Sequence, residues 1–404
     1  MLKGGTKVKK SVVKALIGAG VVAMSMLALT GCATKSAANK GNTAGNTIKI
    51  GVNMELSGVV AGYGEQEKQG VELAVKQINA AGGVKVGNSK KKLTAVYRDN
   101  KSSTNGAAAV AAQLANNEKV VAIVGPATTN NGTASIPNVT KAAVPMVGPS
   151  ATDPNFTLQK NGQVQPYVFR ACFTDTFQGQ KAAVFADDTL KAKNVAIIAD
   201  NSTDYGTGLT KAFKKKFTGK VVTTEYYQSG DKDFNAMLTN IKNKKIDAIY
   251  APGYYSELGL LIKQARQSGI KVPIIGADGM ADPKLAQIAG NENATDVYYT
   301  TPFSTLGANR SSLVKTFMNN YQKQYNANAP TFSALAYDSV YMIKQAIEDQ
   351  KSADSASIAK GLAKIKNMPG VTGTTSIDSK HNPEKPIAVE ELTQGKITKA
   401  YTVK

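Results

Sequence analysis

The chain has 404 residues, more than a single hydrophobic core usually supports, so we expect two domains. Hydrophobic residues make up 42% and charged residues 19% of the chain, which favours a soluble globular protein over a disordered one. The net charge of +20 comes from scattered lysines, for example at positions 90–92 and 214–216, without interleaved aromatic residues. Nucleic-acid binding requires a clustered basic stripe, so we expect no nucleic-acid partner.

The first 32 residues have the pattern of a secretion signal. Five lysines precede the apolar run from Ala15 to Leu29, which is shorter than the roughly 20 residues needed to cross a bilayer. The run ends in Leu29-Thr30-Gly31-Cys32, which resembles a bacterial lipobox. We therefore expect lipidation of Cys32, anchoring to the outer face of the cytoplasmic membrane, and a flexible tether over residues 33–46.

Cys172 is the only other cysteine. It cannot form an internal disulfide bond once Cys32 is lipidated, and no CxxC pair is present, so the sequence supports no metal, redox or other cofactor site. Its apolar neighbours Val168 and Phe169 predict a buried structural thiol.

The mature chain opens with a strand, a loop and a helix over residues 48–83. Ile48–Met54 is an apolar run, and apolar residues recur at helical spacing from Val71 to Ile78. We expect a long loop between them that carries Tyr63. Gly62-Tyr63-Gly64 lacks the third glycine of a phosphate-binding fingerprint. In an open parallel sheet such a loop lies at the carboxyl ends of the strands, so it predicts the mouth of a ligand site.

Strands and helices then alternate in two blocks, which predicts an α/β fold with parallel sheets. Two strands of the first block end in loops rich in hydroxyl groups and small residues, at 125–129 and 148–152. Further strands are expected at residues 93–97, 120–124, 144–147, 194–199, 221–227, 246–251, 272–275 and 297–303, and helices at 104–114, 129–141, 204–217, 234–241, 258–265, 311–325, 331–348 and 356–365, followed by a β-like tail from residue 371.

Seven short motifs, taken in order, resemble the branched-chain amino-acid binding proteins of ABC importers, which are type I periplasmic binding proteins. They are SGVVAGYG at 57–64, GVELA at 70–74, INAAGG at 78–83, GPSAT at 148–152, DYGTG at 204–208, GYYSE at 253–257 and GADG at 276–279. The resemblance covers nearly all of the mature chain. It implies two Rossmann-like lobes that are joined by three crossover segments and close on a ligand.

The resemblance also implies the lobe boundaries. Lobe I is expected at residues 47–172 and 303–375, and lobe II at 173–302 and 376–404. The three crossover segments are expected near residues 171–175, 300–304 and 372–376.

The same resemblance assigns the groups that hold a free amino acid. Thr129 and Thr152 bind its carboxylate, each following a strand end, and the carbonyl of Ser150 accepts from the ammonium group. Ala151, between Ser150 and Thr152 in the same loop, is also expected to bind the ligand. Burying either charge of the amino acid unpaired would cost several kcal/mol, so each needs a partner.

In the second lobe, the resemblance implies that Asp278 is the acidic partner of the ammonium group, where many relatives have Glu. It also implies that Tyr205 covers the ligand and that Tyr254 reaches its carboxylate. Tyr63, Ala127 and Phe332 fall at the family's side-chain pocket positions, where such residues favour an aliphatic group. Read one by one, these threonines could be helix or turn caps, Asp278 a turn residue, and the aromatic residues packing.

The implied function is capture of an amino acid, most simply a branched-chain one, by a monomeric lipid-anchored protein that delivers it to the membrane subunits of an ABC permease. Two alternatives stay open: a sensor of the same fold, and an importer of another small amino acid or amide.

An enzyme is not expected. The single histidine, His381, lies in a polar segment typical of a solvated loop, and no HExxH, GxSxG or Cys/His pair occurs. Ser357–Lys360 matches SxxK without its companion motifs.

Overall fold

The computed structural model describes residues 41–306 and 310–403. Cys32 and its predicted lipidation lie outside these residues. The described end of the predicted tether is attached to the protein: the Asn42 amide donates to the carbonyls of Ala115 and Val120, and the N–H group of Ala44 donates to the Ala353 carbonyl.

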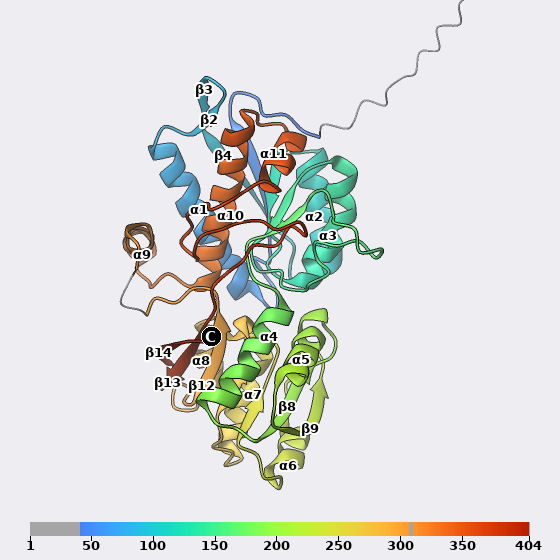
Figure 1. The fold of residues 1–404 in the computed structure, drawn as a ribbon, viewed down its shortest axis with the longest axis vertical. Helices are drawn as coiled ribbons and strands as arrows, with labels where there is room; N and C mark the ends of the chain where they lie inside the picture. The colour runs from blue at the N-terminus through green and yellow to red at the C-terminus, as the bar shows by residue number, and fades with distance from the viewer. Residues whose placement is uncertain (1–40, 307–309, 404) are drawn as a thin grey trace, which may run out of the picture. The chain divides into compact units, whose positions relative to one another are not determined.

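The first sheet is parallel throughout and forms the centre of lobe I (Figure 1). The helices α1, α10 and α11 share one apolar core with it, and α2 and α3 share another, so helices cover both of its faces. The helix α9 packs on the α10 side through Phe317 and Tyr321. In order across the sheet the strands are β4 (Leu93–Asp99), β1 (Ile48–Met54), β5 (Ala122–Val124), β6 (Met146–Gly148) and β7 (Val168–Arg170). The helices are α1 (Ala61–Ala80), α2 (Thr104–Asn116), α3 (Thr129–Ala142), α9 (Ser312–Tyr325), α10 (Thr331–Gln350) and α11 (Ser355–Leu362).

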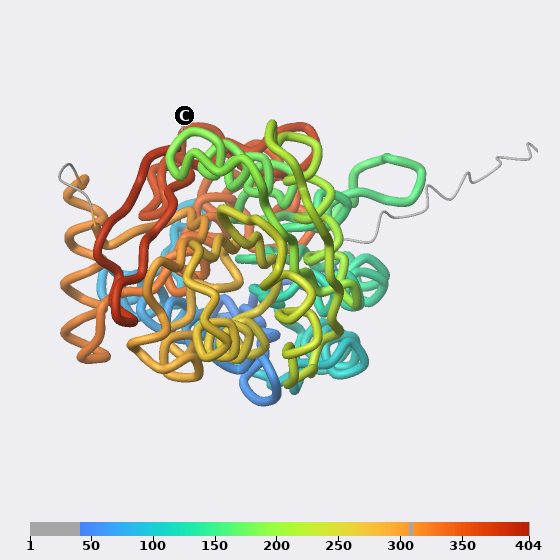
Figure 2. Tube along the Cα trace, turned by 90° about the horizontal axis from the view of Figure 1, so that it is seen from below, coloured from blue at the N-terminus to red at the C-terminus, as the bar shows by residue number. Residues whose placement is uncertain are grey.

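Two smaller features extend lobe I. A hairpin is formed by β2 (Val84–Val86) and β3 (Ser89–Lys91). Residues 154–166, between β6 and β7, form a loop that projects beside α3 (Figures 1 and 2).

The second sheet forms the centre of lobe II. Five of its strands are parallel, and an antiparallel hairpin from the end of the chain extends one edge. The strand order is β9 (Lys220–Tyr227), β8 (Asn194–Asp200), β10 (Ala248–Tyr250), β11 (Ile274–Gly276), β12 (Val297–Thr301), β13 (Ala388–Thr393) and β14 (Lys396–Thr402). One face carries α4 (Asp175–Val184), which continues into a π-helical turn at Phe185–Thr189, and α5 (Asp204–Lys216). The other carries α6 (Asn235–Lys242), α7 (Tyr255–Gln267) and α8 (Lys284–Ala289).

The chain passes between the two lobes three times: from β7 to α4, from β12 to α9, and from α11 to β13. The predicted fold class is therefore confirmed as an α/β fold in which one sheet is parallel and the other is parallel apart from the hairpin at its edge. The residue boundaries given above for the lobes and crossovers stay a prediction.

The predicted loop after β1 is shorter than expected, because α1 already begins at Ala61 and Tyr63 lies in its first turn. Gly62 was expected in this loop, but it lies in α1, and its lack of a side chain permits a close contact. A Cβ atom at this position would lie 2.0 Å from Asp282 Oδ2. The glycine thus allows the start of α1 to approach lobe II.

The expectation of a solvated His381 is wrong. The side chain is buried, its Nδ1 lies 2.9 Å from the Val168 carbonyl oxygen, and its ring stacks on Phe169 with centroids 4.1 Å apart. Burial lowers the pKa of His381. The polar neighbours of His381 correctly indicated a loop. The prediction of exposure failed because this loop packs against the edge strand β7. Cys172 is buried as predicted.

The packing of α1 on α10 yields a stability prediction. A Cβ atom at Gly70 would lie 2.1 Å from the Ser333 carbonyl oxygen in α10, a backbone atom that moves only with its helix. We expect G70A to lower the free energy of unfolding by about 2–3 kcal/mol, as overpacking does. Denaturant unfolding measures this, with G45A as the control because a Cβ atom there meets nothing within 4 Å. Equal stability of the two variants would contradict the packing described.

Candidate ligand-binding site

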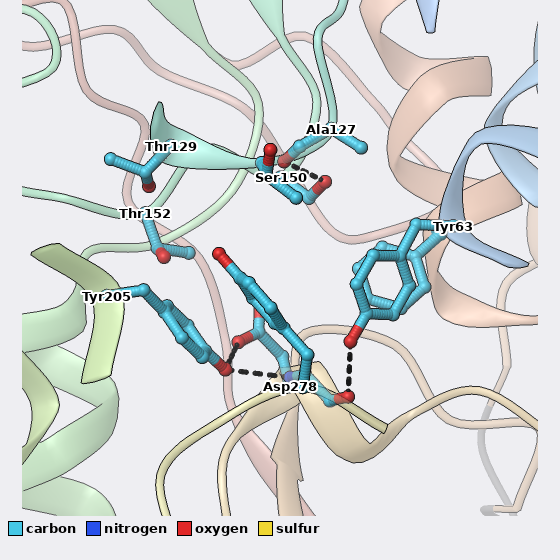
Figure 3. Close-up of a pocket in the computed structure, with 11 residues that line it drawn as sticks. Tyr63, Ala127, Thr129, Ser150, Thr152, Tyr205 and Asp278 are labelled. Atoms are coloured by element: carbon cyan, nitrogen blue, oxygen red, sulfur yellow. Dashed lines mark hydrogen bonds between the residues drawn. The ribbon is translucent and has the colours of Figure 1, made fainter. Parts of the chain in front are cut away.

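A small cavity lies between the carboxyl ends of the strands of both sheets (Figure 3). From lobe I it is lined by residues that follow β5 and β6, together with one residue each from α1 and α10. From lobe II it is lined by residues that follow β8, β10 and β11. The lining residues are Tyr63, Ala127, Thr128, Thr129, Ser150, Thr152, Tyr205, Tyr254, Asp278, Gly279 and Phe332.

Nine of the ten residues predicted to bind ligand lie on this wall. The tenth, Ala151, does not; it is fully buried and its carbonyl oxygen accepts a hydrogen bond from Arg170. Thr128 and Gly279 line the cavity and were not predicted.

Glu55, fully buried at the end of β1, shapes the loop between β5 and α3. Its Oε2 accepts from the Ala127 N–H group, and its Oε1 accepts from the N–H and hydroxyl groups of Thr128 and from the Asn131 amide, at 2.7–3.2 Å. Glu55 thus occupies the amides that precede α3. The next amide, that of Thr129, belongs to the first turn of α3, where N–H groups have no partner within the helix.

Arg170 fixes the loop after β6. Its buried guanidinium group donates from Nη1 to the Ala151 carbonyl at 2.9 Å and from Nη2 to the Asp153 carbonyl at 2.5 Å. Among the described residues, no carboxylate lies within 4.0 Å of Arg170. Its positive charge therefore adds to that of the α3 N-terminus at this end of the cavity.

Two hydroxyl groups lie at this end (Figure 3). Thr129 Oγ1 accepts from the Asp153 N–H group at 3.3 Å, which leaves its proton available to donate. Thr152 Oγ1 is buried beside the Asp175 carboxyl group and, within the described part of the chain, makes no hydrogen bond of normal geometry. This end of the cavity therefore offers donors suited to an anion.

The opposite end is acidic. Asp278 is 3% exposed, and its Oδ1 accepts from the Tyr205 hydroxyl at 2.7 Å and from the Gln178 amide at 3.0 Å. No basic side chain of the described residues lies within 4.0 Å of Asp278. Burial raises the pKa of Asp278 to about 6, although the hydrogen bonds from Tyr205 and Gln178 oppose the shift.

Aromatic rings form the apolar wall. Tyr205 and Tyr254 are stacked with ring centroids 5.0 Å apart, and Tyr63 lies 4.6 Å from Phe332 and 5.8 Å from Tyr254 between centroids. Desolvation raises the pKa of Tyr205 and Tyr254, so both are neutral phenols. The wall offers apolar contact and no second charge.

Direct hydrogen bonds join the lobes beside the cavity. The Tyr63 hydroxyl donates to the Gly279 carbonyl at 2.5 Å, and the Gly62 N–H group donates to the Tyr255 hydroxyl at 3.1 Å. The Gln66 amide donates to Asp282 at 2.8 Å. The start of α1 is thus bound to lobe II.

Known proteins resemble this chain over most of its length. The family described as periplasmic binding protein matches residues 47–396. This chain belongs to that family. The resemblance inferred from the short motifs is therefore confirmed.

Individual members are similar as well. The Leu/Ile/Val-binding protein homolog 3 of Brucella melitensis is 32% identical over 334 residues, 81% of this chain and 86% of that protein. The structure of the branched-chain amino acid transporter substrate binding protein LivJ from Streptococcus pneumoniae, in complex with isoleucine, is similar with a TM-score of 0.84 and 42% identity, covering 88% of this chain and 99% of that one. The leucine binding protein LivK from Thermotoga maritima gives a TM-score of 0.80 at 31% identity, with 88% and 99% covered.

Several residues that build the site were missed in the sequence. Glu55, Arg170 and Gln178 do not line the cavity, yet each holds a loop or side chain that does. The one signal in the sequence that could have indicated such a residue is a charged residue directly after an apolar strand, as Arg170 is after Val168 and Phe169. The SxxK match has a structural role: Ser357 bonds to Asp354, the residue that caps α11. Within residues 41–306 and 310–403, no group of three His, Cys, Asp or Glu side chains is arranged to hold a metal ion.

Substitution of Glu55 tests whether its carboxylate holds the loop after β5 in place. In E55A four buried donors lose their acceptor, so we expect the free energy of unfolding to fall by about 3–5 kcal/mol. E55Q keeps one acceptor oxygen and should lose less. Denaturant unfolding of both variants measures the difference. An E55A variant as stable as the wild type would show that this carboxylate does not hold the loop.

Proposed function

We propose that this protein captures a free branched-chain aliphatic amino acid between its lobes and delivers it to an ABC permease. The observation that carries the proposal is the polarity of the cavity: the buried carboxyl group of Asp278 lies at one end, and the hydroxyl groups of Thr129 and Thr152 lie at the other. Apolar rings lie between them. A zwitterion with an aliphatic side chain would provide a partner for the acidic end, for the hydroxyl groups and for the apolar rings at the same time.

In this proposal the ligand carboxylate accepts from Thr129 and Thr152, and Tyr254 reaches the same group. The ammonium group binds Asp278 and the Ser150 carbonyl. Tyr205 covers the ligand. The side chain lies against Tyr63, Ala127 and Phe332, which contribute to an apolar cluster that continues into lobe II. The named relatives that bind leucine or isoleucine support this cargo.

Binding and closure are coupled in this scheme. Thr129 and Thr152 belong to lobe I, and Asp278, Tyr205 and Tyr254 to lobe II. Only an arrangement with the lobes together lets one ligand contact both sets, so the ligand shifts the population toward it. The closed form is the one that a permease would recognise.

The membrane attachment is a further part of the proposal. The signal-like leader and lipobox support lipidation at Cys32 and a position outside the cytoplasmic membrane. No helix among the described residues is long and apolar enough to span a bilayer. We propose a monomer tethered beside its permease, with no catalytic role.

Thermal unfolding across the twenty amino acids tests the cargo. Leucine, isoleucine or valine at about 100 times its Kd should stabilise the protein by about 2.7 kcal/mol. Lysine and aspartate should not, because the pocket has no partner for a second charge. Stabilisation by a charged amino acid alone, or by none of the twenty, would contradict the proposal and favour another solute.

The acidic end predicts how binding depends on pH. The protonated form of Asp278 cannot pair with an ammonium group, so ligand binding requires the carboxylate. With a pKa of about 6, leucine affinity should be constant above about pH 7 and fall by up to about tenfold per pH unit below 6. Isothermal titration calorimetry measures the profile.

D278N is the matched variant for this profile. We expect it to weaken binding by about 100-fold, because the ammonium group is left without a charged partner. Its residual binding should lose the dependence between about pH 5 and 7. A D278N variant with the wild-type affinity would exclude Asp278 as the ammonium partner.

A further inference from the structure

Gln178, fully buried on α4, uses every hydrogen-bonding position of its amide. Its Nε2 donates to Oδ1 of Asp278 and to Oδ1 of Asp175, both at 3.0 Å. Its Oε1 accepts from the Thr300 hydroxyl at 2.9 Å and from the Asp278 N–H group at 3.3 Å. The amide therefore has one orientation, and it fixes which oxygen of Asp278 is occupied.

These partners connect the cavity with the segments that join the lobes. Asp175 begins α4, directly after the first passage of the chain between lobes, and Thr300 lies in β12, directly before the second. Gln178 is the side chain that reaches both segments and the acidic end of the cavity. The position of Asp278 is thus tied to the connections about which the lobes would move.

Asp175 is a second buried carboxyl group beside Asp278. It is fully buried, and its Oδ2 has no hydrogen-bond partner among the described residues. No basic side chain of those residues lies within 4.0 Å of it. Burial above all, and the neighbouring Asp278, raise the pKa of Asp175, whereas the Thr152 hydroxyl, which lies next to this carboxyl group, opposes the shift. Two such groups without a cation cannot both be ionised at modest cost.

One neighbour opposes protonation: the Arg170 guanidinium group attracts Asp175 electrostatically, although it lies more than 4.0 Å from the carboxyl group. The charged or titratable neighbours from the packed elements are Tyr205 of α5, Tyr250 of β10, Tyr254 before α7, Arg170 of β7, Cys172 and Asp153. Burial raises the pKa of the three tyrosines and of Cys172, which keeps them neutral. Arg170 directs its donors to the carbonyls of Ala151 and Asp153.

We propose that Gln178 is a positioning residue that holds Oδ1 of Asp278 so that Oδ2 faces the ligand, while Asp175 stays protonated. The pair then carries one negative charge, which matches the one ammonium group of an amino acid. This inference rests on the proposed function, because it concerns the same site. It adds a residue outside the cavity that sets both affinity and the charge the site accepts.

Leucine titrations of variants test the positioning role. Q178A should bind leucine about 10- to 100-fold more weakly, because Asp278 loses its orienting donor. T300V removes only a hydroxyl group outside the cavity and should weaken binding several-fold through Gln178. Q180A, on the same helix and without a side-chain contact to the site, is the control and should bind as the wild type. Thermal unfolding establishes that each variant is folded.

The pH profile of D175N tests the protonation state, which a purely structural role would not affect. If Asp175 is neutral, an amide there leaves the midpoint of leucine binding near that of the wild type. If Asp175 were ionised, removing its charge would lower the pKa of Asp278 and move the midpoint down by about one unit or more. Such a shift, or wild-type affinity in folded Q178A or T300V, overturns this inference alone. A wild-type protein that binds no amino acid overturns the proposed function itself.

Discussion

The cleft depends on a carboxyl group that is buried without a cation. Asp278 is 3% exposed, and its only side-chain partners in the described chain, Tyr205 and Gln178, are neutral donors. These hydrogen bonds offset part of the cost of desolvation, so the group remains able to ionise near neutral pH. The same donors are fixed by other contacts: Tyr205 accepts from the Gly279 N–H group, and Gln178 accepts from Thr300. The start of α5, the start of α4 and the end of β12 are thereby organised around one acidic group.

Lobe I also contains buried carboxyl groups, those of Glu55 and Glu67, and the two have different roles. Glu55 only accepts hydrogen bonds, from the backbone and side chains that precede α3. Glu67 contacts the Ser150 hydroxyl at 2.5 Å, and that hydroxyl also lies 2.8 Å from the Ala127 carbonyl. Ser150 is the donor in both contacts, and its single hydroxyl proton is shared between Glu67 Oε1 and the Ala127 carbonyl oxygen. Burial raises the pKa of Glu67, and the hydrogen bond from Ser150 opposes this shift. The loops after β5 and β6 are therefore held together behind the cavity wall.

The sequence predicted what depends on local periodicity, and much less of what depends on distant contacts. The strand Ile48–Met54 and the helix α10 follow directly from their apolar spacing. The start of α1 was placed too late, because Gly62 looks like a loop residue until Asp282, 220 positions later in the numbering, is seen beside it. The burial of His381 depends on Phe169 in the same way. Cavity residues were found through the family motifs, whereas Gln178 and Arg170 act from behind the wall, where no local pattern marks them.

The contacts between the lobes reduce the binding free energy that the ligand must contribute to closure. Tyr63 bonds to Gly279, Gly62 bonds to Tyr255, and an apolar cluster runs across the same boundary, so part of the closing energy comes from the protein itself. With the lobes together, Thr152 Oγ1 is buried without a hydrogen bond of normal geometry, and the carboxyl group of Asp278 is buried without a cation among the described residues. In the proposed binding mode a zwitterion removes both costs, since its carboxylate would accept from the hydroxyl and its ammonium group would pair with the acid. A ligand with only one of these charges relieves one end and leaves the other buried unpaired. On this argument selectivity for free amino acids comes from relief of burial costs at two ends of one cavity, and the apolar rings between them select the side chain.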